Sequence, residues 1–172
     1  MIKYYSMAIS SSEIINTTGI RLSRGACVVI VRTEWNPEVV DPLEKGCTEL
    51  LQQHNIPYKI VTVPGAFEIP FAVQHYWNHH KYKDDKPSAF IALGCVLRGD
   101  TPHFEYVSHA VTEGILQLNL SLPVPTIFGV LTVNTQEQAD ERTGGKHGNK
   151  GAEAAATALK MISLSQSFQQ HS

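Results

Sequence analysis

The sequence lacks long hydrophobic runs, a surplus of basic residues and a leader-like beginning. Its apolar runs are all much shorter than the roughly 20 residues of a membrane-spanning helix, which argues against a membrane protein. A formal net charge of −2 over 172 residues argues against a general nucleic-acid-binding surface. The stretch from Met1 to Ser6 contains no continuous apolar segment, so we expect no secretory signal and a cytoplasmic protein.

Cysteines are few and widely separated. Cys27, Cys47 and Cys95 show no CxxC spacing, which argues against a disulfide framework and against a zinc site. Buried free thiols in a reducing cytoplasm are the simplest interpretation. A nucleophilic Cys95 is disfavoured because the sequence places no histidine or other base to activate it.

Nucleotide and metal motifs are also missing. Residues 141–151 are rich in glycine and basic residues, but they have neither P-loop nor Rossmann spacing. His75 and His79 have the i, i+4 spacing of a helical metal pair, yet their charged, loop-like surroundings favour a solvated helix end. We therefore expect no metal site.

What is present is the composition of one globular domain, with 42% hydrophobic and 17% charged residues. Apolar runs that predict buried strands alternate with helical periodicity, which predicts a parallel sheet with helices on both faces. We expect a flavodoxin-like three-layer sandwich of class α/β with strand order 2-1-3-4. The expected strands are 26–31, 58–63, 89–93 and 126–133, and the longer helices are 41–55, 71–78, 104–120 and 152–163. Residues 1–25 are expected to form an N-terminal arm, mobile or docked on a neighbouring subunit, before a domain at 26–165 and a polar tail at 166–172.

The stretch 94–107 is the best candidate for the chemistry. It follows a buried strand and leads into a helix, and parallel sheets bind ligands at the carboxyl ends of their strands. Free amides at a helix start suit a phosphate. Gly99 permits close backbone approach, and Thr101 could cap the helix or donate to an oxyanion. His103 can move a proton near neutral pH.

Other strand ends carry residues with two interpretations each. Trp35 could pack the top of the core, which spacing alone favours, or stack on a flat ligand. Phe67 and Glu68 could be an ordinary helix start, or an apolar wall and an acceptor for a ligand. Arg142 could lie in a flexible connection, or clamp an oxyanion with its guanidinium.

Four segments, in order, resemble one known family. They are residues 63–70 (Val-Pro-Gly-Ala-Phe-Glu-Ile-Pro), 98–107 (Arg-Gly-Asp-Thr-Pro-His-Phe-Glu-Tyr-Val), 128–132 (Phe-Gly-Val-Leu-Thr) and 148–151 (Gly-Asn-Lys-Gly). Together they are similar to 6,7-dimethyl-8-ribityllumazine synthases of riboflavin biosynthesis. The resemblance implies a transferase that condenses 5-amino-6-(D-ribitylamino)uracil with 3,4-dihydroxy-2-butanone 4-phosphate. A Schiff base forms, phosphate is eliminated and the ring closes with loss of water, without a metal or organic cofactor.

The resemblance also implies the roles of individual residues. Trp35 matches an aromatic that stacks on the pyrimidine, Asn36 follows it as in the family, and Glu68 would accept from ribityl hydroxyls. The same loops would supply Ala66 and Phe67 around the ribityl chain and ring, Cys95, Val96 and Leu97 at the pyrimidine edge, and Gly99, Asp100 and Thr101 in the phosphate loop. His103 matches the general acid/base.

Phe128, Arg142 and Lys150 match residues that the neighbouring subunit supplies, with Arg142 on the phosphate. The resemblance therefore implies an active site between subunits of a homopentamer, and some pentamers of the family build icosahedral shells. The short link at 144–148 resembles the shell-forming type.

Two positions depart from the family's pattern. Glu34 stands where an arginine is usual, and Asp100 must point away from a bound phosphate because like charges repel. Two competing functions are a non-catalytic flavin- or lumazine-binding relative and an unrelated phosphate-ester enzyme. His103 together with two cations favours catalysis over binding alone, and the sequence shows no acidic metal cluster at strand ends.

Overall fold

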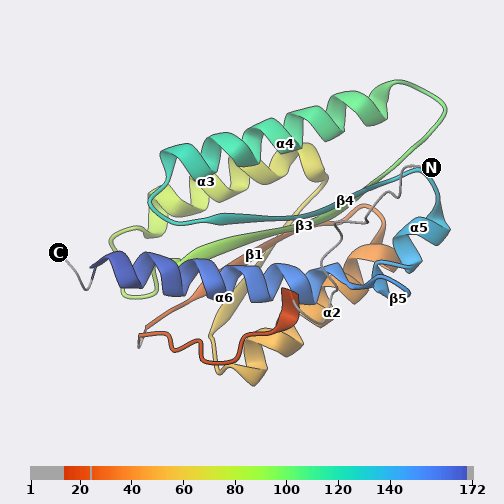
Figure 1. Ribbon diagram of the computed structural model, residues 1–172. Helices are drawn as coiled ribbons and strands as arrows, with labels where there is room; N and C mark the ends of the chain where they lie inside the picture. Colours follow the sequence, from red (N-terminus) through yellow and green to blue (C-terminus); the bar gives the residue numbers. More distant parts are fainter. Residues whose placement is uncertain (1–13, 24, 170–172) are drawn as a thin grey trace, which may run out of the picture.

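The computed structural model describes residues 14–23 and 25–169 and has the predicted α/β architecture (Figure 1). Four parallel strands form one sheet in the order β2-β1-β3-β4, which confirms the predicted order. Figure 1 shows α3 and α4 on one face of the sheet and α2 and α6 on the other, and each helical layer encloses its own apolar core. The strands are β1 (Val28–Thr33), β2 (Tyr58–Val63), β3 (Ala89–Leu97) and β4 (Thr126–Val133).

The remaining elements connect and cover these strands. The helices are α2 (Pro37–Gln53), α3 (Ile69–His80), α4 (His103–Ser121), α5 (Gln136–Asp140) and α6 (Lys150–Gln169), with a 3-10 turn η1 (Ala66–Glu68) before α3. No helix within the described residues combines the length and the hydropathy that a membrane crossing requires.

Strand β3 is longer than the sequence predicted. Its pairing with β4 continues from Gly94 opposite Val130 to Leu97 opposite Val133, so it ends four residues beyond the expected end at position 93. The extension follows from the partner strand, because β4 offers backbone hydrogen bonds up to Val133. Cys95, Val96 and Leu97 are therefore strand residues at the carboxyl end of β3 and not part of a turn.

Helix α2 begins earlier than the expected start at Asp41 and Pro42. Asn36, in the left-handed region with φ 57°, precedes the helix, and Pro37 occupies its first turn. Proline suits that place because its missing N–H would have no helical partner there. Pro42 lies inside α2, where it removes one helical hydrogen bond.

The connections on either side of α4 and α5 also differ from expectation. Pro102, and not Thr101, takes the position before α4 and provides no side-chain cap in the described structure. Thr135 caps α5 by accepting from the Gln138 amide at 3.4 Å. The expected flexible stretch after α5 forms a small antiparallel hairpin, β5 (Thr143–Gly145) and β6 (Gly148–Asn149).

Both ends of the domain are more ordered than the sequence predicted. Helix α6 continues to Gln169, so the expected tail is helical as far as that residue. The described part of the N-terminal arm contacts its own chain, because Ile15, Ile20 and Leu22 pack against the α2/α6 core. Thr17 Oγ1 lies 2.7 Å from His54 Nε2, which fixes the arm to the end of α2. Residues 1–13 and 170–172 lie outside the described residues.

Candidate active site

A cavity of about 440 Å³ lies at the carboxyl ends of β1, β2 and β3. Parallel sheets place ligands at this edge, where the loops that follow neighbouring strands converge. Nine predicted site residues line it: Trp35, Asn36, Ala66, Phe67, Glu68, Cys95, Val96, Leu97 and His103. The structure thus brings together the groups that the sequence placed at three separate strand ends.

The loop after β1 presents an aromatic ring to this cavity. Trp35 is 71% exposed, so the prediction that it packs the core is wrong. The loop itself is fixed, because Glu34 N donates to Val63 O at 2.9 Å and Thr33 Oγ1 donates to Trp35 O at 3.2 Å. Asn36 Nδ2 donates to Cys95 O at 2.9 Å and joins the loop to β3. The indole is therefore held at the cavity by its backbone, with most of its surface exposed and able to stack on a ligand.

The turn after β2 supplies a second aromatic ring and a carboxylate. Phe67 is 62% exposed and lines the cavity, so it does not act as a packed helix staple. One oxygen of Glu68 accepts from the Gly65 amide at 3.0 Å, which makes it a helix-start acid as well as a cavity residue. Its other oxygen can accept from a ligand hydroxyl. The helix-start interpretation of Glu68 is therefore confirmed, and its carboxylate also lines the cavity.

Cys95 contributes its backbone carbonyl to the structure of the site, and its thiol is not suited to act as a nucleophile. Burial raises the pKa of the Cys95 thiol to about 11, and the Glu38 carboxylate adds to the shift. A thiol with that pKa stays protonated near neutral pH, so it is a poor nucleophile. Its carbonyl is the group that Asn36 binds.

The loop 98–102 connects two cavity residues, Leu97 and His103, and is exposed. A Cβ at Gly99 would meet nothing within 4 Å, so the backbone there is open to a ligand. Asp100 and Thr101 are exposed beside it. His103 is the first residue of α4, and its imidazole borders the cavity next to the amides of the helix start.

Arg98, which begins this loop, is engaged elsewhere. Its Nε donates to Asn134 Oδ1 at 2.7 Å, its Nη1 pairs with the Glu105 carboxylate, and the guanidinium lies 4.1 Å from the centre of the Phe104 ring. The Arg98 guanidinium also lowers the pKa of Glu105 through this hydrogen bond. Arg98 therefore fixes the loop to α4 and is not aimed at the cavity.

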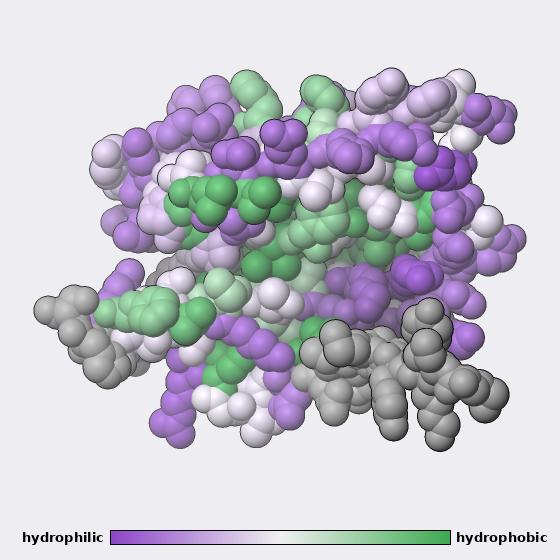
Figure 2. Space-filling model, turned by 45° about the horizontal axis from the view of Figure 1, so that its top comes forward, coloured by the Kyte–Doolittle hydropathy of each residue, from purple (hydrophilic) through white to green (hydrophobic). Residues whose placement is uncertain are grey.

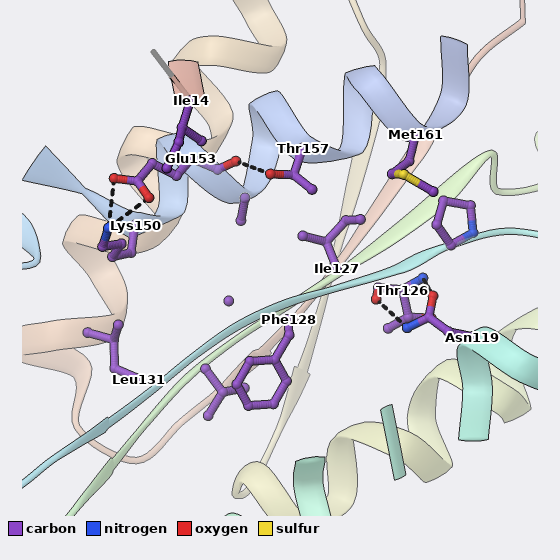
Figure 3. Close-up of a pocket in the computed structure, with 14 residues that line it drawn as sticks. Ile14, Asn119, Thr126, Ile127, Phe128, Leu131, Lys150, Glu153, Thr157 and Met161 are labelled. Carbon is purple, nitrogen blue, oxygen red and sulfur yellow. Dashed lines mark hydrogen bonds and ion pairs between the residues drawn. The ribbon is translucent and has the colours of Figure 1, made fainter. Parts of the chain in front are cut away.

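Phe128, Arg142 and Lys150 do not reach this cavity in the single chain. Phe128, which is 43% exposed, and Lys150 line a different groove of about 540 Å³ between β4 and α6 (Figure 3). Arg142 lies just after α5, where its Nη1 donates to Gln138 O at 2.8 Å. The predicted site residues therefore form two groups on different surfaces of the molecule.

Sequence reasoning missed one residue of the second group. Glu153 is 7% exposed, and its two carboxylate oxygens accept from Lys150 Nζ at 2.9 and 2.8 Å (Figure 3). Thr157 Oγ1 donates to the Glu153 carbonyl at 2.8 Å one turn further on. The i, i+3 spacing of Lys150 and Glu153 at a helix start was the available signal.

The surface around the second group is apolar. Figure 2 shows hydrophobic residues gathered in a band across the middle of one face, with hydrophilic residues above and below it. The exposed apolar side chains include Phe128 on β4, Met161, Leu164 and Phe168 on α6, and Leu116 and Leu120 on α4. Exposed apolar surface of this kind marks sites of association with another protein surface.

A flavodoxin-like sandwich whose strand ends hold an exposed indole, a carboxylate and a histidine has the architecture of α/β proteins that bind ligands at the carboxyl ends of their strands. The chain belongs to the 6,7-dimethyl-8-ribityllumazine synthase family, whose family model matches residues 25–166.

Curated relatives agree with this membership. The chain is 49% identical over 138 residues to the 6,7-dimethyl-8-ribityllumazine synthase of Porphyromonas gingivalis, covering 78% of this chain and 83% of the relative. It is 44% identical over 143 residues to the enzyme of the same name from Phocaeicola vulgatus, covering 81% of this chain and 82% of the relative. The chain is also 48% identical over 136 residues to the 6,7-dimethyl-8-ribityllumazine synthase of Cytophaga hutchinsonii, covering 77% of this chain and 82% of the relative.

Proposed function

We propose that this protein condenses 5-amino-6-(D-ribitylamino)uracil with 3,4-dihydroxy-2-butanone 4-phosphate to form 6,7-dimethyl-8-ribityllumazine. The observation that carries the proposal is the cavity in which Trp35, Glu68 and His103 meet. Membership of the synthase family supports the same reaction. The indole stacks on the pyrimidine, Glu68 accepts from the ribityl hydroxyls, and His103 moves protons between the condensing groups.

The chemistry needs positioning and proton transfer more than a reactive side chain. The amino group of the pyrimidine attacks the ketone, and a Schiff base forms with loss of one water. Phosphate then leaves, and the ribitylamino nitrogen closes the ring on the remaining carbonyl carbon with loss of a second water. Holding the two substrates side by side removes much of the entropic barrier of such a condensation. His103, at the mouth of the cavity, would take the proton from the attacking amine and return it to the departing oxygen.

The phosphate requires a cation that the cavity does not provide. Among the described residues that line it none is lysine or arginine, and Arg98 is paired with Glu105. The loop containing Gly99, Asp100 and Thr101 would offer amides, with the Asp100 carboxylate turned to solvent. Arg142 of a neighbouring chain would supply the charge and bind the phosphate with its guanidinium.

This arrangement supports an active site shared between chains. Phe128, Arg142 and Lys150 lie away from the cavity of their own chain, beside an apolar surface that suits association. We infer a homopentamer, in which each chain supplies the strand-end half of one site and the β4/α6 half of the next; further assembly into an icosahedral shell belongs to the same proposal. Three free buried cysteines suit the reducing cytoplasm in which we place the enzyme.

The direct test combines turnover with size. The purified protein is incubated with both substrates while the absorbance of the lumazine product is followed, and the active species is then sedimented. We expect product only with both substrates present, and activity in a species of at least five chains. A protein that binds lumazine without forming it would be a binding relative, and an active monomer would refute the shared site.

A further inference from the structure

The segments that carry the two candidate cations of the second group are joined by one side chain, that of Asn149. Asn149 ends β6 and directly precedes Lys150, the first residue of α6. Thr143, which pairs with Asn149 across the hairpin, directly follows Arg142. Lys150 N also donates to Arg142 O at 2.9 Å, so the backbones of the two cations are in direct contact.

The Asn149 amide is hydrogen-bonded at both of its atoms. Its Nδ2 donates to Pro42 O at 2.9 Å and to Thr143 O at 3.4 Å. Its Oδ1 accepts from the amides of Gly151 at 2.8 Å and Ala152 at 3.1 Å. One side chain thus caps α6 while also tying the hairpin and α6 to the middle of α2.

The surface of α2 is shaped to receive this side chain. A Cβ at Gly46 would overlap the Asn149 amide, and a Cβ at Gly151 would overlap the carbonyl of Leu43. Glycine at both places lets the start of α6 and the hairpin approach α2 as closely as backbone contact permits. Close packing of this kind leaves the Asn149 amide little freedom to shift.

We propose that Asn149 is a positioning residue that sets Arg142 and Lys150 in place for the phosphate-bearing substrate of the neighbouring active site. The inference rests on the proposed function, since it takes Arg142 as the group that binds the phosphate. Asn149 itself reaches neither substrate and acts through the backbone bonds of Thr143 and α6. A displacement of about 1 Å is enough to weaken charge-assisted contacts severely.

The first test separates the two roles of the Asn149 side chain, which are capping of α6 and donation to Pro42 O and Thr143 O. In N149D the carboxylate still accepts from the amides at the start of α6, but the donor to Pro42 O and Thr143 O is lost. We expect N149D and N149A alike to raise the KM for the butanone phosphate roughly tenfold or more, with the KM for the pyrimidine unchanged. An N149D variant with the wild-type KM would show that Asn149 only caps α6 and would overturn the proposal.

A matched control accounts for lost stability. Asn119 has the same kind of side-chain connections, since its Nδ2 donates to Ile115 O at 3.0 Å and Thr126 O at 2.9 Å and its Oδ1 accepts from Thr126 N at 2.9 Å. It ties α4 to the start of β4, at the end of the β4/α6 groove that lies far from Lys150 (Figure 3). N119A should lower the unfolding temperature about as much as N149A without raising the KM for the butanone phosphate. An equal rise in that KM for N119A would assign the effect to general loosening and overturn the proposal.

Mixing of variant chains tests which half of the site Asn149 serves. R142A and H103A chains are first refolded together; a gain in turnover over either alone supports the shared site. A mixture of N149D and H103A chains should then also gain turnover, because the H103A chains supply an intact Arg142 half. A mixture of N149D and R142A chains should gain none, because the Arg142 half is impaired in both. If only the R142A and H103A pair gains, Asn149 does not serve the Arg142 half and the inference is wrong. If that pair shows no gain, the shared site is wrong, and the butanone phosphate KM of N149D alone decides the role of Asn149.

Discussion

The two halves of the candidate site are built in different ways. Around Trp35 and His103, hydrogen bonds hold the loops at the strand ends, while the side chains stand in solvent. Around Lys150, a hairpin and two helices are packed so closely that glycine is required at Gly46 and Gly151. The first half thus offers exposed side chains to a ligand, whereas the second is formed by closely packed backbone. A shared site of this kind combines an open wall with a tightly packed one.

The largest effect is expected where the second half is most tightly packed. Gly151→Val puts a branched side chain against the Leu43 carbonyl and should destabilise the protein by about 3 kcal/mol or more, or prevent folding. Denaturant unfolding of the purified variant measures this loss. Gly99→Ala, in the open loop of the first half, should change stability by about 0.5 kcal/mol or less. Equal losses for the two variants would contradict the difference in packing.

The next effect belongs to proton transfer in the first half. His103→Ala should lower turnover by roughly 10²-fold or less, the size of a general acid/base contribution, with little effect on stability because His103 is exposed. The measurement is kcat across a range of pH. Unchanged turnover would remove His103 from the mechanism.

A smaller effect is expected from the charge of the second half. Arg142→Ala should weaken binding of the butanone phosphate by about 2 kcal/mol, roughly 30-fold, which is the usual size of a lost hydrogen bond to a charged group. Arg142→Lys should restore part of it, since a lysine keeps the charge without the planar fork. Steady-state KM values for both substrates measure the change. A loss of affinity confined to the pyrimidine would contradict the assignment.

The smallest effect concerns the thiol of the first half. Because burial raises the pKa of Cys95 to about 11, iodoacetamide at pH 8 should label it far more slowly in the folded protein than in urea. The raised pKa also sets the direction of the pH dependence of stability. The stability contributed by the neutral Cys95 thiol is fully present below about pH 8.5 and is lost as the pH rises towards 11. Peptide mass spectrometry gives the labelling rates. Rapid labelling of the folded protein would restore Cys95 as a nucleophile candidate.

The sequence predicted the sheet and the first half because strand runs and strand-end loops are local patterns. The bounds of β2 and β4 matched, since each is one apolar or alternating run framed by turns. The end of β3 did not, because it depends on pairing with β4. The start of α2 was misplaced because two pairs, Asn36-Pro37 and Asp41-Pro42, carry the same helix-start signal.

The second half was less accessible to sequence reasoning. The stretch 141–151 was expected to be a flexible link, and its hairpin depends on contacts with α2 that lie more than 100 residues away in the chain. The burial of Glu153 likewise depends on how α6 packs against β4 and the arm. Long-range packing of this kind leaves no periodic signal, so the residues alone left the role of Arg142 open and only the resemblance pointed to Lys150.

The exposure of Trp35 gives the molecule a built-in optical probe. The chain has two tryptophans, and the second, Trp77, lies partly buried on α3 near the opposite end of the sheet. Emission from Trp35 in water is red-shifted, and a stacked heterocycle would quench it, while the Trp77 signal stays constant as an internal reference. Occupancy of the strand-end half can thus be followed by intrinsic fluorescence, without a label and without turnover.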